Sequence, residues 1–82
     1  MILYGSRARG TAQQGSDWDL LLLTEKERLK PDDEKKLRMP VFLQELAVGQ
    51  AFSLQIFNLR EWHSKYRSTP YYENIQQEGI LL

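Results

Sequence analysis

The sequence predicts an α/β (α+β) fold in which helices pack on one side of a short mixed β-sheet. Three observations support this: strand patterns at about residues 1 to 4, 18 to 24 and 51 to 59, a long helical segment before the last of them, and two short helical segments after it. With 82 residues, the chain is expected to form one domain, residues 1–82.

Each strand has its own pattern. Met1 to Tyr4 is apolar and ends at the turn residue Gly5. Leu20 to Leu23 is a continuous apolar run entered through Trp18. Residues 51 to 59 alternate between apolar and polar side chains, with Phe57 in place of a polar residue, which is typical of a strand with one face in the core.

The long helix is expected to begin at Pro31, where three acids follow, and to run to about Val48 before Gly49. Pro40 lies inside this segment and should kink the helix or split it in two.

Two shorter helices are expected near the carboxyl end. Asn58 to Glu61 has the spacing of a capping box, and Thr69 with Pro70 starts a second helix that ends at Gly79. Their aromatic side chains are interpreted as core or partner-packing residues, and no catalytic role is expected for His63. The apolar segment Ile80 to Leu82 is expected to add an edge strand or to contact a second chain.

Asp17 and Asp19 lie at the start of the second predicted strand. Side chains two positions apart in a strand point to one face, about 6 to 7 Å apart, so the carboxylates should converge. Such like charges repel, and a hard divalent cation such as Mg²⁺ or Mn²⁺ relieves the repulsion. The pair predicts a metal site; the alternative is a pair of turn acids that cap the strand.

Gly5 and Ser6 follow the first strand and should open one or two helical turns, from Ser6 to Thr11. Backbone N–H groups at a helix start attract anions, so a flexible glycine followed by a hydroxyl suits a phosphate tail. Arg7 and Arg9 could bind phosphate oxygens, or else pair with carboxylates or remain solvated. We therefore expect a triphosphate site beside the metal site.

The glycine spacing from Gly5 to Gly10 also matches that of a P-loop. Thr11, however, stands where the phosphate-binding lysine belongs, and Ala12 stands where the metal-binding hydroxyl belongs. A P-loop NTPase is therefore excluded. Gly10 to Ser16 is instead interpreted as a polar loop that returns the chain to the aspartates.

Gly5-Ser6, ten intervening residues and Asp17-Trp18-Asp19 resemble the G-S-x₁₀-D-x-D signature of the DNA polymerase β-like nucleotidyltransferase superfamily, most closely its small prokaryotic minimal nucleotidyltransferase domains. Later segments are also similar, so the resemblance covers nearly the whole chain: Glu61-Trp62, Thr69-Pro70-Tyr71-Tyr72 and Glu78-Gly79. It implies transfer of a nucleotidyl group from an NTP, expected to be ATP, to a hydroxyl acceptor. Asp17 and Asp19 would be the catalytic metal ligands, and the nucleotide-binding residues would be Gly5, Ser6, Arg7 and Arg9.

The resembling family also carries a third carboxylate on the third strand, which completes the metal site and can act as general base. Aligning Glu61-Trp62 with the family's acidic-aromatic pair puts Ser53 at that position, with Gln55 next on the same face. Neither side chain is ionised, so Ser53 is interpreted as a degenerate third position.

Two hypotheses of function follow. One is a nucleotidyltransferase; the other is a catalytically weak or inactive nucleotide-binding protein, such as the antitoxin-like partner of a helical toxin. The missing acid favours the second hypothesis. So does the absence of the N-terminal helix that related domains usually carry. This absence suggests a truncated or mis-started chain, or a helix supplied by a partner.

The amino-acid composition limits the classes of binding partner and the cellular location that are expected. Eleven basic and eleven acidic residues give no net charge, so nucleic-acid or anionic-membrane binding is not expected. The longest strongly apolar run is too short to cross a bilayer, and no signal-peptide pattern is present. The chain has no cysteine, which excludes thiolate chemistry and agrees with a cytoplasmic location. A protein partner or self-association is expected because both ends of the chain are apolar.

Overall fold

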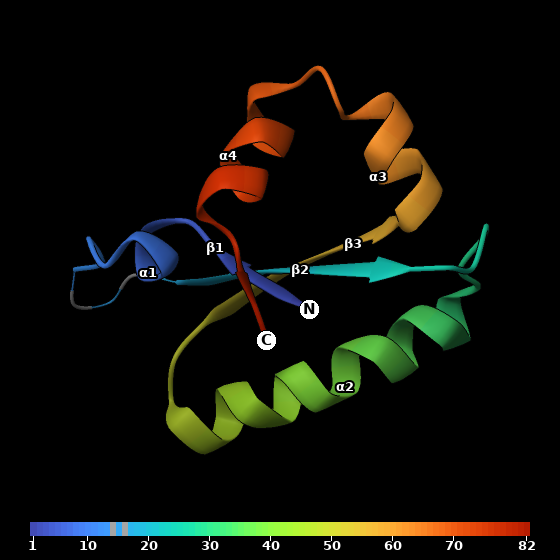
Figure 1. The fold of residues 1–82 in the computed structure, drawn as a ribbon. Coiled ribbons are helices and arrows are strands. Elements are labelled where there is room, and N and C mark those ends of the chain that lie inside the picture. Colours follow the sequence, from blue (N-terminus) through green and yellow to red (C-terminus); the bar gives the residue numbers. More distant parts are fainter. Residues whose placement is uncertain (14, 16) are drawn as a thin grey trace.

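The chain folds around one four-stranded mixed sheet (Figure 1). The structure is a computed structural model that describes residues 1–13, 15 and 17–82, so Gln14 and Ser16 of the predicted polar loop lie outside the described residues. The strands are β1 (Ile2–Tyr4), β2 (Trp18–Thr24), β3 (Phe52–Asn58) and β4 (Ile80–Leu81), and their order across the sheet is β3-β2-β1-β4. The predicted α+β class and mixed sheet are confirmed.

Strand β2 occupies an inner position and sets the register of the sheet. It pairs antiparallel with β1 and parallel with β3, while β1 pairs antiparallel with β4. The carboxyl-terminal segment Ile80–Leu81 therefore forms the predicted edge strand.

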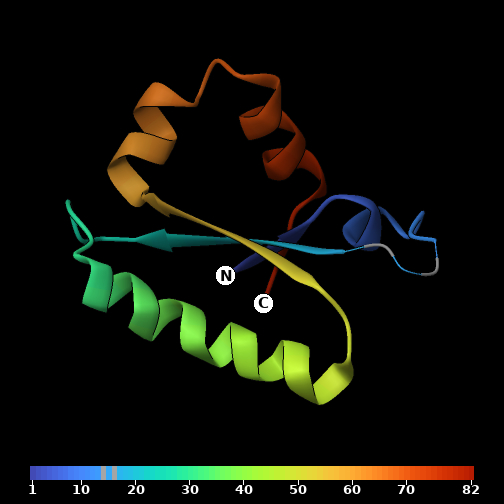
Figure 2. The ribbon, with the colours of Figure 1, turned by 180° about the vertical axis from the view of Figure 1, so that it is seen from behind.

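Helices cover both faces of the sheet, which corrects the prediction that they pack on one side. Figures 1 and 2 show α2 (Pro31–Val48) on one face and α3 (Leu59–Lys65) with α4 (Pro70–Glu78) on the other. The reason lies in the apolar run of β2: successive side chains alternate between faces, so Leu20 and Leu21 each need a cover.

Two small cores result, one on each face. On the α2 face, Leu20 packs with Val41 and with the strand residues Leu3 and Leu54. On the opposite face, Leu21 packs with Trp62 and Ile75, and further side chains surround that cluster: Ile2, Tyr4, Leu23, Phe57, Tyr66, Tyr71 and Tyr72. The aromatic side chains of α3 and α4 thus serve packing, as predicted.

Helix α2 is continuous through Pro40, so Pro40 does not split the helix in two, which was one of the two expected outcomes. An interior proline removes one backbone hydrogen bond and costs about 3 kcal/mol in an exposed helix. Tertiary contacts hold the helix on both sides of it. Arg38 Nη1 donates to the carbonyl of Leu54 on β3 at 3.0 Å, and Val41 is buried in the core.

The capping residues of α3 and α4 act as predicted. Asn58 Oδ1 accepts a hydrogen bond from the Glu61 amide at 3.0 Å, and Thr69 Oγ1 accepts one from the Tyr72 amide at 3.2 Å. These caps satisfy amides that the first turn of a helix leaves unpaired. No helix among the described residues is long and apolar enough to cross a membrane.

Candidate active site

The predicted site residues gather where β1 leaves the sheet and β2 enters it. Asp19 on β2 is the Cα partner of Tyr4 on β1 and of Ser53 on β3. Residues paired in this way point to the same face, so the three form one row across the sheet. This is the face covered by α3 and α4, because Tyr4 packs against their core cluster. Asp17 precedes β2 by one residue, which brings two carboxylates to this end of the row.

Gly5 lies directly against the Asp19 carboxylate. Its φ is 77°, a conformation that side-chain-bearing residues rarely adopt, and a Cβ placed on it would overlap Asp19 Oδ2. The backbone after β1 can therefore approach the carboxylate only because residue 5 is glycine. This contact links the two halves of the sequence motif.

We expect Gly5→Ala to destabilise the protein by about 1 to 3 kcal/mol through backbone strain, with a further loss from the overlap with Asp19. Gly10→Ala is the comparison variant. Gly10 also has a positive φ, 74°, but its ψ of 15° is in the left-handed helical region, which strains an alanine less than the ψ of −158° at Gly5 does. In addition, no atom lies within 4 Å of the Cβ added at Gly10. Thermal unfolding should show a larger loss for Gly5→Ala. Equal losses for the two variants would contradict the close approach to Asp19.

Helix α1 (Ser6–Arg9) is a single turn, the shorter of the predicted lengths. It ends at Gly10, whose left-handed conformation lets its N–H group reach the Ser6 carbonyl. Gly5 occupies the N-cap position and no side chain caps the helix, so Ser6 is its first residue. The Ser6 hydroxyl therefore has no capping role here.

Asp19 lies in an unfavourable place for a charged group. Partial burial raises its pKa above the ordinary range, the neighbouring Asp17 raises it further, and Arg9 opposes both effects. Asp17 itself is exposed. The folded protein therefore holds two close carboxylates at a free-energy cost, which a bound cation would relieve.

We expect Asp19→Asn to raise the thermal midpoint of the metal-free protein at neutral pH. A carboxyl whose pKa is raised by folding destabilises the folded state when ionised, and this penalty is lost as the pH falls through its folded pKa. The difference between wild type and variant should therefore shrink under acid conditions. Midpoints measured against pH with a chelator present test this, and a lower midpoint for the variant at neutral pH would contradict it.

The two predicted phosphate-binding arginines have different surroundings. Arg9 acts electrostatically on Asp19 and forms an ion pair with Glu78 of α4, 3.1 Å from Nη1 to Oε2. The guanidinium of Arg7 lies over the ring of Trp18, 4.7 Å from its centroid. Trp18 packs against the core on the α2 face, whereas Arg9 acts on the Asp19 carboxylate.

Ser53 stands beside Asp19 in the sheet, while Gln55 pairs with Leu21, one step deeper along β3. Within residues 1–13, 15 and 17–82, no group of three or more His, Cys, Asp or Glu side chains could hold a metal ion. The row thus carries a hydroxyl, from Ser53, beside the Asp19 carboxylate.

The sequence patterns do not predict a pair of phenol groups formed by Tyr4 of this row and Tyr71 of α4. Tyr71 of α4 donates a hydrogen bond to the Tyr4 hydroxyl at 3.1 Å. Burial raises the pKa of Tyr71, and the Tyr4 hydrogen bond and the charge of Asp19 raise it further. The patterns identify Tyr4 only as a strand end and Tyr71 only as a packing residue. One signal for Tyr4 is available in the sequence: Tyr4 ends β1 just before the turn at Gly5. Because β1 pairs antiparallel with β2, this strand end lies beside Asp19.

Comparison with known proteins adds the family. A protein-family model described as "Polymerase beta, Nucleotidyltransferase" matches residues 1–82. Searches of curated proteins and of solved structures gave no match. Members of the matched family generally bind nucleoside triphosphates and use divalent metal ions. Since the match spans every residue, the chain belongs to the polymerase β nucleotidyltransferase family.

Proposed function

We propose that the chain binds an NTP, with ATP as the first candidate, together with Mg²⁺ or Mn²⁺ at the Gly5–Asp19 end of the sheet, and transfers the nucleotidyl group slowly to a hydroxyl acceptor. The observation that carries this proposal is the row formed by Asp19 and Ser53, with Gly5 against the Asp19 carboxylate. This geometry supports the proposal because it brings the Asp19 carboxylate against the turn that we assign to the phosphates, and Ser53 is the residue that we assign to the third acidic position.

Asp17 and Asp19 are the residues that would hold the cation. Their oxygens are hard ligands, and the raised pKa of Asp19 reflects its partial burial together with the negative charge of Asp17. A divalent ion there would neutralise charge on the phosphates and orient them for an in-line displacement. The backbone at Gly5 and Ser6 would hold the β and γ phosphates, and Arg9 would add positive charge nearby.

In the proposed reaction, the acceptor hydroxyl oxygen forms a bond to the α-phosphorus of the NTP. The bond from that phosphorus to the oxygen bridging the α and β phosphates breaks, and pyrophosphate leaves. The acceptor proton must pass to a base. Ser53 is a poor base at neutral pH, so proton removal falls to water or to the acceptor's own surroundings, and slow turnover follows.

The proposal is tested by following label from an α-labelled NTP into candidate protein and small-molecule acceptors with Mg²⁺ or Mn²⁺. Slow transfer that disappears in Asp17→Asn and Asp19→Asn is the expected result. Transfer that persists in both variants would overturn the assignment of these carboxylates.

A second candidate is a nucleotide-binding protein without turnover, with an antitoxin-like role toward a helical partner. The specific observation in its favour is again Ser53 beside Asp19, because it removes one charge from the row. The two candidates separate in the same assay. Metal-dependent NTP binding with no transfer to any acceptor supports the second, and transfer dependent on Asp17 and Asp19 supports the first.

A further inference from the structure

Helix α2 carries a stripe of apolar side chains on its outer face. Met39, Phe42, Leu43 and Leu46 are between 42% and 66% exposed. Their spacing of three, four and seven residues places them along one side of the helix. We call these four residues the α2 stripe. Figure 1 shows α2 as the outermost layer on its side of the sheet.

The opposite side of α2 is the one that contacts the protein's own core. Val41 is the single residue of α2 that is buried, at 8% exposure. Successive residues of an α-helix are turned by about 100° around its axis. On this basis, the side chains of the α2 stripe point, on average, away from the side of the helix that carries Val41. The stripe therefore contributes little to the core described above, although four adjacent apolar side chains are costly to leave in water.

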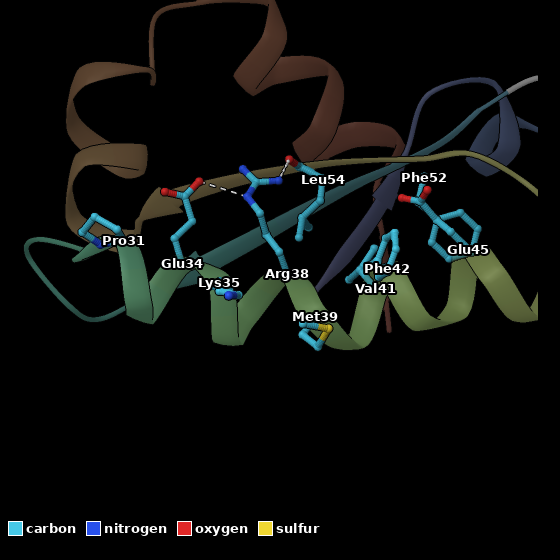
Figure 3. A pocket seen from close by; sticks show the side chains of 10 residues that line it. All are labelled: Pro31, Glu34, Lys35, Arg38, Met39, Val41, Phe42, Glu45, Phe52 and Leu54. Carbon is cyan, nitrogen blue, oxygen red and sulfur yellow. Dashed lines mark hydrogen bonds and ion pairs between the residues drawn. The ribbon is translucent and has the colours of Figure 1, made fainter.

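Charged side chains border the stripe on the β3 side. Arg38 and Glu45 are seven residues apart and so lie on the same edge of the helix. Figure 3 shows Arg38 on this edge. Its Nε donates a hydrogen bond to Glu34 Oε1 at 2.9 Å, and its Nη1 donates one to the Leu54 carbonyl. A groove of about 520 Å³ lies between this edge and β3, and its walls include Phe42 and Glu45.

Two copies of α2 can match their apolar stripes and their charged edges at the same time only when the two helices run in opposite directions. A two-fold axis between Phe42 and Leu43 puts Met39 of one copy opposite Leu46 of the other. In an antiparallel pair, equal edges face each other. Arg38 then lies within about 3 Å along the axis of Glu45 in the second copy, at about 1.5 Å per residue, and the symmetry forms this pair twice.

A parallel pair lacks this match. The edge that then faces Glu45 carries Lys36, which lies about 13 Å away along the axis, at about 1.5 Å per residue. An antiparallel pair also places the two helix dipoles in opposition, which is favourable. Charge and dipole thus select the same arrangement.

We propose that the α2 stripe is a homodimer interface, in which α2 packs antiparallel against α2 of a second copy of this chain. The four apolar side chains of each copy form the centre, and the Arg38–Glu45 pairs close one edge. The groove between α2 and β3 gives the flanking side chains of the second copy a place to lie. Helix α2 covers one face of the sheet, and the row of Tyr4, Asp19 and Ser53 lies on the other, so this proposal does not depend on the proposed function.

The first test is the molar mass in solution from low to high micromolar concentration, by light scattering and sedimentation. Wild type should be a dimer, and Leu46→Glu should raise the dimer dissociation constant by at least about tenfold, because it puts a charge in the centre of the interface. Gln44→Glu is the matched control, since it makes the same kind of charge change on an exposed residue outside the stripe. Circular dichroism checks that each variant is folded. A folded wild-type monomer throughout this range would overturn the proposal and leave the stripe to a different protein.

The second test is orientation. Because the chain has no cysteine, Met39→Cys and Leu46→Cys each introduce a single thiol. Under mild oxidation, a mixture of the two variants should give mainly the mixed disulfide, since residue 39 faces residue 46 in the antiparallel pair. Disulfides mainly between identical variants would show a parallel pair, and no disulfide enrichment over a Gln44→Cys control would show that α2 does not form the interface. Either result contradicts the proposed arrangement.

Discussion

Ser53→Asp is expected to increase the rate of nucleotidyl transfer by about 10² to 10⁴-fold, the range typical of a positioned general base. Ser53 is the Cα partner of Asp19, so an aspartate there would stand beside the existing carboxylates. It would supply both a third oxygen ligand for the cation and a base for the acceptor proton. The same change should lower the thermal midpoint of the metal-free protein, because it adds a third like charge, and Mg²⁺ should reverse that loss.

The control for this prediction is Gln55→Asp, which adds the same charge on the same face of β3 but beside Leu21. Ser53→Asn, which cannot ionise, should leave the rate near that of wild type. Label transfer from an α-labelled NTP measures all three variants. A rate increase in Gln55→Asp that Ser53→Asp lacks would show that the third position belongs to residue 55 instead of residue 53.

Much of the fold can be predicted from the sequence because its signals are local. Proline and acids at Pro31 begin a helix, Thr69 caps another, and the run from Leu20 defines a strand. The arrangement of helices over the sheet cannot be predicted in the same way. Successive side chains of a strand point to opposite faces of the sheet, so a continuous apolar run such as Leu20 to Leu23 places apolar side chains on both faces. Helices on both faces follow only from this step, which the local helix and strand signals do not include.

In the candidate site, too, the features that lie close together in the sequence can be predicted and the long-range contacts cannot. The spacing of Gly5, Asp17 and Asp19 in the sequence is enough to predict a shared site, because each residue belongs to a strand end or to the turn between strands. The Tyr4–Tyr71 hydrogen bond joins residues 67 positions apart, and no local pattern marks it. Pro40 shows the converse, since contacts to β3 and the core override a strong local signal for a helix break.

The most direct measurement of the central claim is the thermal midpoint with and without Mg²⁺ and each of the four NTPs. A ligand that binds only the folded state stabilises it by about 2.7 kcal/mol at a hundredfold excess over its dissociation constant. For a domain of this size, that corresponds to a shift on the order of ten degrees. Wild type should show this shift with at least one NTP in the presence of Mg²⁺, and Asp17→Asn combined with Asp19→Asn should abolish it. No shift for wild type with any NTP, or an equal shift in the double variant, would contradict a metal–nucleotide site at these carboxylates.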